Sequence, residues 1–287
     1  MEKKAKSNIY STPIFNEVLS PTYNLSILVG IGRLSYFLTN PLKDIVYQGV
    51  YHALPYQKWD LIQFITDILD EDKVLTLSYK HVKIVFDNRL VTLVPNVLYS
   101  DENPVLYLEK VVNIPDEHVV LIDTITDIAA QNIYAIPEKV YHIFRDQYGS
   151  NTYYHLSTAI IKSCQSFIEY KIDTEKVVFL NIQQNQIHVI AFDRTQLLFY
   201  NTFNFQNAED LVYYVLLVYE QLGLHNEKVP LYIAGKIQEE SQIHDRLYQY
   251  IRYLHFVSRT DFYRFDKSFK SIPSHFFFDL YSLHTCA

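Results

Sequence analysis

The chain has 287 residues, a formal net charge of -7 at pH 7 and a sequence pI of about 5.9. Hydrophobic residues make up 49% and charged residues 20%, so the chain can bury a large core and is not intrinsically disordered. No basic stripe is present, which argues against nucleic-acid and anionic-membrane partners. No run approaches the roughly 18 apolar residues of a membrane span, and no apolar stretch follows the basic N-terminus. Cys164 and Cys286 build no disulfide framework. We therefore expect a soluble cytoplasmic protein.

Three short strands open the regular part of the chain. Residues 1–23 look like an extended arm, and strands are then predicted over 24–30, 34–40 and 45–54. Pro41 marks a turn, because proline cannot continue a strand ladder. A helix over 59–70 is predicted from apolar residues at helical spacing, namely Trp59, Ile62, Ile65, Ile68 and Leu69.

The middle of the chain mixes strands and helices. The stretch "VKIVFDNRLVTLVP" over 82–95 reads as a hairpin, with two β-rich runs around Asp87 and Asn88. A short helix is expected after Pro104, and strands at about 118–126 and 131–136. Two helices follow over 137–149 and 155–170. The second of these places Cys164 on its apolar face as a small core residue.

The second half begins again with three strands, at about 176–182, 186–193 and 196–205. An amphipathic helix over 208–222 ends before Gly223, and a short apolar run over 229–235 is typical of a buried parallel strand. A helix within 240–254 and a last short strand at 255–258 complete the pattern.

The two halves have the same order of elements. Each starts with three strands on tight turns, which pair as an antiparallel meander, and each continues with helices and further strands. This layout is that of a ribonuclease-H-like half, and two such halves resemble the actin-like ATPase fold. We therefore expect an α/β protein with an arm at 1–23, a first half at 24–170 and a second half at 171–287.

Two motifs carry a closer resemblance. "VKIVFDNRLVTLVPNVLY" and the tail "HFFFDLYSLHTC" are similar to marks of domain of unknown function 3822, a family of Bacteroidota. The resemblance implies an actin-like ATPase fold with no established activity, substrate or catalytic residue. The chain also resembles the pilus-assembly branch of that superfamily, whose members hold partner proteins.

The loops that bind nucleotide in actin-like ATPases are degraded here. Such proteins cradle phosphates in one turn per half, with a glycine and usually an aspartate. The first turn keeps Gly30, Gly32 and Arg33 but has no aspartate, and the second has Asn181 and Gln183 in place of Asp-x-Gly. The adenosine loop retains Gly235 alone. These six residues would contact ATP if it bound, but amide side chains are weak Mg²⁺ ligands, so we expect no cofactor and no metal.

Other catalytic patterns are weak. No Walker A motif, no C-x-x-C and no pair of histidines at i, i+4 is present, so neither a P-loop nor a zinc site is predicted. His155 and Ser157 could form part of a triad, but helix capping explains them better. Asp123 and Asp127 could be paired carboxylates, but solvated loop acids are the simpler interpretation.

The sequence therefore favours a non-catalytic actin-like protein that binds another protein or its own copy. An ATP-binding switch or weak ATPase that uses the inter-domain cleft is the alternative, and a small-molecule kinase is the second alternative. A kinase needs an acid near the cleft and a glycine-rich adenosine loop, and this chain lacks the latter.

Overall fold

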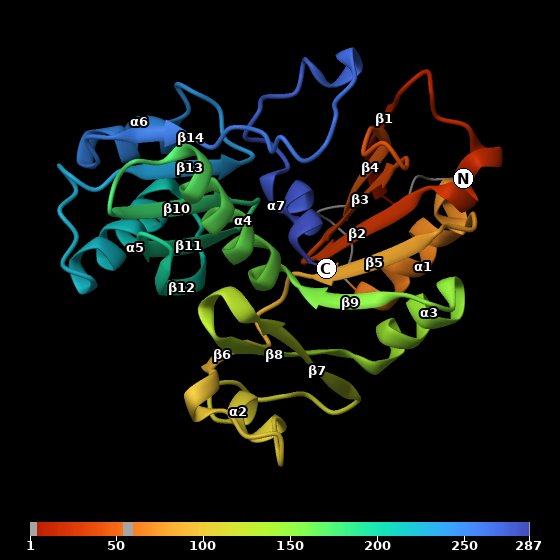
Figure 1. Ribbon diagram of the computed structural model, residues 1–287, viewed down its shortest axis with the longest axis horizontal. Coiled ribbons are helices and arrows are strands. Elements are labelled where there is room, and N and C mark those ends of the chain that lie inside the picture. Colours follow the sequence, from red (N-terminus) through yellow and green to blue (C-terminus); the bar gives the residue numbers. More distant parts are fainter. Residues whose placement is uncertain (1–4, 54–59, 287) are drawn as a thin grey trace. The chain divides into compact units, whose positions relative to one another are not determined.

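The computed structural model describes residues 5–53 and 60–286. Two compact units are present (Figure 1): unit 1 comprises residues up to Thr158 with Asp261–Ser271 and Cys286, and unit 2 comprises Ala159–Thr260 with Ile272–Thr285. The predicted halves, 24–170 and 171–287, remain a prediction, because the units are defined by contacts and not by the repeat.

Unit 1 is built on a mixed sheet. In the described part of the chain its strand order is β1-β4-β3-β2-β5-β9, with bounds Ala5–Ser11 (β1), Ile45–Ala53 (β4), Arg33–Thr39 (β3), Asn24–Gly30 (β2), His81–Phe86 (β5) and Thr152–His155 (β9). Strands β2, β3 and β4 pair antiparallel in sequence order, and β5 and β9 run parallel to β2. The predicted meander is confirmed. Strand β1, in the N-terminal arm, adds to its open edge by pairing with β4.

Two helices bury one face of this sheet. Helix α1 (Leu61–Glu71) begins at Asp60, whose carboxylate accepts a hydrogen bond from the backbone N–H of Gln63. Helix α3 (Glu138–Tyr148) follows Pro137 and ends at Gly149, where φ is +65°. The apolar sides of both helices join one core with β2, β3 and β5. Trp59, expected in the first helix, lies outside the described residues.

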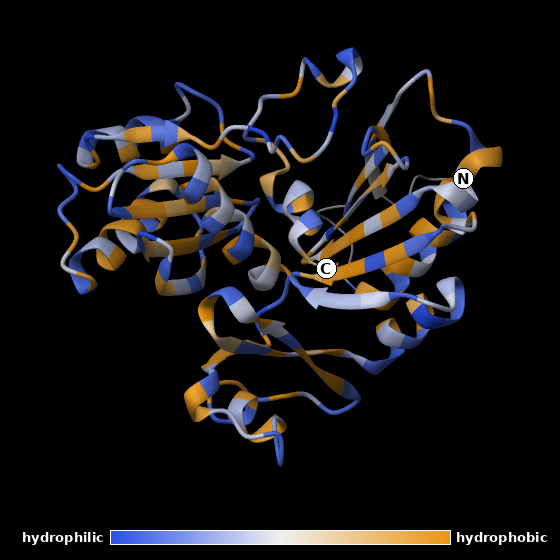
Figure 2. Cartoon of the chain, in the orientation of Figure 1, coloured by the Kyte–Doolittle hydropathy of each residue, from blue (hydrophilic) through white to orange (hydrophobic). Residues whose placement is uncertain are grey.

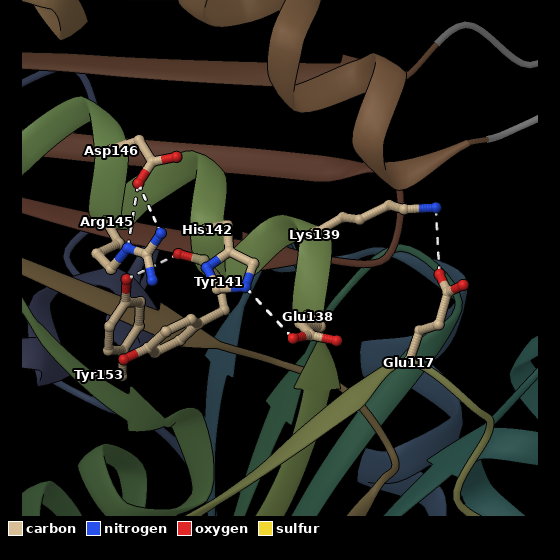
Figure 3. A network of polar contacts seen from close by, with 8 residues as sticks. All are labelled: Glu117, Glu138, Lys139, Tyr141, His142, Arg145, Asp146 and Tyr153. Atoms are coloured by element: carbon tan, nitrogen blue, oxygen red, sulfur yellow. Dashed lines mark hydrogen bonds and ion pairs between the residues drawn. The ribbon is translucent and has the colours of Figure 1, made fainter.

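The outer side of α3 carries polar pairs (Figure 3). Lys139 Nζ lies 3.1 Å from a carboxylate oxygen of Glu117, and Arg145 lies 3.0 Å from Asp146. These side chains are largely exposed, and pairs of this kind contribute little stability. We therefore assign α3 a packing role, with a solvated outer face.

Tyrosines converge on a buried carboxylate at the end of α1. The hydroxyls of Tyr36 and Tyr51 both donate to Asp72 Oδ2, the second over 2.6 Å. Asp72 also accepts the N–H of Val74, which starts the 3-10 helix η2 (Lys73–Thr76). These bonds satisfy polar atoms that would otherwise be costly to bury, so at least part of the tyrosine content stabilises the core.

The segment between β5 and α3 forms a small three-stranded subdomain. Its strands are β6 (Val91–Pro95), β7 (His118–Ile125) and β8 (Ala130–Pro137), in the order β6-β8-β7, with 3-10 helices η3 (Asn96–Leu98) and η4 (Thr126–Ile128) and helix α2 (Val105–Glu109). The predicted hairpin over 82–95 is wrong, because β5 pairs with β2 and β9 and β6 pairs with β8. Strand β5 has parallel partners on both sides, so no edge is left for β6.

Unit 2 repeats the same topology. Among its described residues the strand order is β12-β11-β10-β13-β14, with bounds Gln196–Asn204 (β12), Gln186–Asp193 (β11), Lys176–Ile182 (β10), Leu231–Gly235 (β13) and Leu254–Phe256 (β14). The first three strands again form an antiparallel meander, and β13 and β14 again run parallel to the first strand. The predicted repeat of the strand order is confirmed.

Helices α5 (Ala208–Gln221) and α6 (Gln242–Tyr250) belong to the same core as the unit 2 sheet. On the sheet, β10 alternates between this core and an aromatic group made by Phe179, Phe192, Tyr232 and Phe167 of helix α4 (Leu156–Lys171). The ribbon of Figure 2 shows the apolar strands of this sheet in orange. The residues of β10 are therefore buried on both faces, as expected for a central strand.

The C-terminal segment contributes residues to both units. Residues 261–271, with the 3-10 helix η5 (Lys267–Phe269), belong to unit 1, where the ring of Tyr263 meets Phe37 at a centroid distance of 5.2 Å. Residues 272–285, with helix α7 (Phe278–Tyr281) and the 3-10 helix η6 (Ser282–Thr285), belong to unit 2. Within the described ranges, no helix has the length and apolar character to span a membrane.

Candidate nucleotide site

In unit 1 the first predicted phosphate turn joins β2 to β3. Gly30 pairs with Arg33, so Ile31 and Gly32 form a two-residue hairpin turn, and Gly32 has φ +65°. The carbonyl of Gly32 accepts the N–H of Ala53 over 2.9 Å. Gly30 and Arg33 therefore flank this turn, and the positive φ of Gly32 favours glycine there.

An acid lies beside this turn although none lies within it. Asp87 follows β5, is 3% exposed and donates its N–H to the carbonyl of Val29 over 2.8 Å. A Cβ placed on Gly30 would lie 3.8 Å from Asp87 Oδ2. The sequence pattern of the turn did not indicate Asp87, because this residue lies outside the turn. The signal was an aspartate directly after an apolar strand, since the carboxyl ends of parallel strands meet at one edge of a sheet.

In unit 2 the second predicted phosphate turn spans 183–185. The N–H of Gln183 donates to the carbonyl of Gln186 over 2.9 Å, and none of the three turn residues has a positive φ. Glycine is therefore not needed for the turn to close. Asn181 lies within β10 and is 1% exposed, and neither its Oδ1 nor its Nδ2 has a hydrogen-bond partner among the described residues.

The side chain of Gln183 points to the C-terminal segment. Its Nε2 donates to Asp279 Oδ2 of α7 over 3.2 Å and lies 3.5 Å from His188 Nε2. Asp279 is 2% exposed, and its Oδ1 accepts the N–H of Leu280. A buried carboxylate thus lies at the second turn, contributed from a position 96 residues later in the chain.

Gly235 is fixed between β10 and the C-terminal segment. Its φ is +94°, and a Cβ there would lie 2.0 Å from the carbonyl oxygen of Ile182. Its N–H donates to the carbonyl of His275 over 2.9 Å, and His275 Nε2 donates to the carbonyl of Ile237 over 2.7 Å. Burial lowers the pKa of His275, whose ring stacks on Phe256 at 4.1 Å. The predicted adenosine loop is therefore in contact with the chain's own tail.

His155 and Ser157 take part in a buried network at the start of α4. His155 ends β9, its Nδ1 lies 2.7 Å from Ser157 Oγ, and its Nε2 lies 3.0 Å from the carbonyl of Asn88. This pattern assigns the ring proton to Nε2, so that Nδ1 also accepts the N–H of Ser157. His155 thus caps the helix, which confirms the capping interpretation. His155 and Ser157 are 0% exposed, which leaves no access for a substrate.

Asp123 belongs to the same network. The prediction of a solvated loop acid is wrong, because Asp123 lies in β7, is 5% exposed and accepts the N–H of His155 and the hydroxyl of Thr158. Burial raises the pKa of Asp123 to about 6, although these two hydrogen bonds lower it. Its carboxylate therefore positions the backbone N–H of His155 and the hydroxyl of Thr158 at the start of α4, which is a structural role. Asp127 is exposed in η4.

Within residues 5–53 and 60–286, no group of three or more His, Cys, Asp or Glu side chains could hold a metal ion. Cys164 is fully buried in α4, as expected, and burial raises the pKa of its thiol well above the usual value.

Known structures with this architecture share its fold. A Bacteroides thetaiotaomicron protein described as having an actin-like ATPase fold and unknown function is 22% identical, with a TM-score of 0.80 over 96% of this chain and 100% of that chain. The PilM-PilN type IV pilus biogenesis complex matches with 13% identity and a TM-score of 0.58 over 92% and 98%. No curated protein matches the chain. The fold is that of the actin-like ATPases. A family model matches residues 14–254, and the chain belongs to the family of proteins of unknown function DUF3822.

Proposed function

We propose that this protein uses the actin-like ATPase fold to bind a partner protein, without nucleotide hydrolysis. The observation that carries the proposal is the position of residues 275–279. This segment bonds to Gly235 and Ile237 at the predicted adenosine loop and to Gln183 at the predicted phosphate turn. Three of the unit 2 groups that a nucleotide would need, the N–H of Gly235 and the N–H and Nε2 of Gln183, already have partners within the chain, whereas the buried amide of Asn181 has none among the described residues.

The acid at the second turn supports the same proposal. Asp279 is buried, its Oδ2 accepts Gln183 Nε2 and its Oδ1 accepts the N–H of Leu280, so both oxygens already serve contacts within the chain. The similar structure of PilM in complex with PilN is an example of this fold in a protein-binding protein.

The direct test is a thermal-shift titration with ATP and Mg²⁺, together with a phosphate-release assay. A ligand present at about 100 times its Kd adds about 2.7 kcal/mol to the stability of the native state. We expect millimolar ATP to leave the melting temperature unchanged and phosphate release to remain at the buffer blank. Saturable ATP binding at micromolar concentration would overturn the proposal.

One observation favours an ATP-dependent switch as the second candidate. Asp87 lies beside Gly30, so a carboxylate oxygen, the kind of ligand that Mg²⁺ prefers, is next to the first turn. In a switch, a nucleotide at the unit 2 turn would have to displace residues 275–279 of the same unit, so Asp279→Ala would strengthen ATP binding. The same titration on wild type and Asp279→Ala separates the candidates, since the partner-binding proposal expects no shift in either protein.

A further inference from the structure

The three-stranded subdomain of unit 1 exposes aliphatic side chains at one place. Val97 and Leu98 on η3 are 91% and 68% exposed, and Leu106 on α2 and Val111 just after it are 49% and 60% exposed. Val97 is the most exposed large apolar side chain in the described part of the chain. We call these four residues the tip surface.

The two pieces of the tip surface are held together. The hydroxyl of Tyr107 on α2 donates to the carbonyl of Leu98 over 2.8 Å and accepts the N–H of Ser100 over 2.9 Å. The rings of Tyr99 and Tyr107 meet at a centroid distance of 5.7 Å. Figure 2 shows apolar residues in orange on α2 and on the coil beside it, in the lowest part of the view. These contacts therefore join helix α2 to η3 and the residues that follow it.

The tip residues are exposed although the three-stranded subdomain has its own hydrophobic core. Val94, Leu108, Ile133 and Ala135 are at most 7% exposed and form the core of this subdomain. Leu106 precedes Leu108 by two residues, which places them about 200° apart around the helix, so Leu106 faces away from that core. Clustered apolar side chains that the fold does not bury are typical of a binding surface.

Charge defines the kind of partner. Between residues 97 and 111, which include the four tip residues, the sequence has three acidic residues and one basic residue, a net charge of -2. Asp101, Glu102, Glu109 and Lys110 are all exposed. A second copy of the chain would bring the same acids to the interface, and an anionic membrane would repel them. Lysine and arginine beside aliphatic side chains would complement both features.

We propose that the tip surface binds a basic amphipathic segment of a partner protein, whose aliphatic side chains contact the four tip residues and whose basic side chains contact Asp101, Glu102 and Glu109. This inference rests on the proposed partner-binding function and names the surface and the chemistry of the partner. Contact through both features predicts binding that weakens with salt and is lost when the apolar side chains are removed.

The test uses the full chain and a labelled helical probe peptide of leucine and lysine, about 18 residues long. Fluorescence anisotropy compares three proteins. They are wild type, the tip variant, which carries both Leu98→Gln and Leu106→Gln, and a matched control, which carries both Val18→Gln and Leu19→Gln. The control residues are also exposed, 83% and 47%, on the 3-10 helix η1 (Glu17–Thr22). Circular dichroism establishes that all three proteins are folded.

We expect the probe to bind wild type and the control equally, and the tip variant about tenfold more weakly. A peptide with glutamate in place of lysine should not bind. Equal binding to wild type and the tip variant, or no binding to wild type, overturns the inference. Two other results also overturn it: dimerisation of wild type in sedimentation experiments, or binding of wild type to anionic vesicles, if only the tip variant loses it. Either result would mean that a second copy or a membrane binds the tip surface. If the probe fails while ATP still gives no thermal shift, the proposed function stands and only the assigned surface is wrong.

Discussion

Replacing Gly235 by alanine separates a folding role for this glycine from a nucleotide-binding role. The added Cβ would lie 2.0 Å from the carbonyl oxygen of Ile182 and 2.8 Å from the carbonyl carbon and nitrogen of the same residue. These are backbone atoms of the central strand β10, so no flexible side chain can move aside. The φ of +94° is itself strained for a residue with a Cβ.

The magnitude follows from these two effects. Backbone strain at this φ costs about 1–3 kcal/mol. Relief of the clash moves residues 235 and 236 away from β10. This movement weakens two hydrogen bonds, from Lys236 N–H to Ile182 O at 3.0 Å and from Gly235 N–H to His275 O at 2.9 Å. Each is worth about 1 kcal/mol. We therefore expect Gly235→Ala to lower the free energy of unfolding by about 3–5 kcal/mol.

Gly223→Ala is the matched control. Gly223 also has a positive φ, +61°, but nothing lies within 4 Å of its added Cβ, so only the backbone strain of about 1–2 kcal/mol remains. Urea unfolding followed by circular dichroism gives both values, and hydrogen exchange at the amide of Lys236 reports the local opening. If Gly235→Ala costs no more than Gly223→Ala, the close approach of β13 to β10 is wrong. If it is tolerated and abolishes an ATP-induced shift, the nucleotide interpretation of Gly235 is restored.

Two further changes test the core and the buried acid. Leu211→Ala on α5 should cost about 2–5 kcal/mol in urea unfolding, because Leu211 is 0% exposed, whereas Tyr213→Ala, at a residue 60% exposed, should cost far less; equal effects would contradict the packing of α5. The pKa of Asp123 is raised from 3.8 to about 6 by burial, so the ionised carboxylate is the less stable form in the fold. Wild type should lose about 3 kcal/mol of stability as pH rises from about 4 to 6, and Asp123→Asn should lack this step; parallel pH profiles of the two proteins would refute the assignment.

The sequence alone determined the local elements and their repetition. Alternating and helical periodicity, with turn residues such as Pro41 and the helix-ending Gly149 and Gly223, depends on neighbours within a few positions of the chain. For this reason the two meanders, the parallel strand over 231–235 and the helices α3 to α6 could be predicted. Repetition of the same order then led to the duplicated fold.

Only the tertiary structure decided which side chains meet. Whether β5 turns back on itself or joins β2 depends on the open edges of a sheet, which the local pattern does not reveal, and the hairpin prediction was wrong for this reason. Asp87 and Asp279 reach the two turns from other elements, and Asp123 becomes buried through contacts with His155 and Thr158. Asp279 meets Gln183 across 96 residues of sequence, because the fold returns the C-terminal segment to the carboxyl end of β10. Such contacts arise from strand pairing and chain path, and residue type or spacing does not encode them locally.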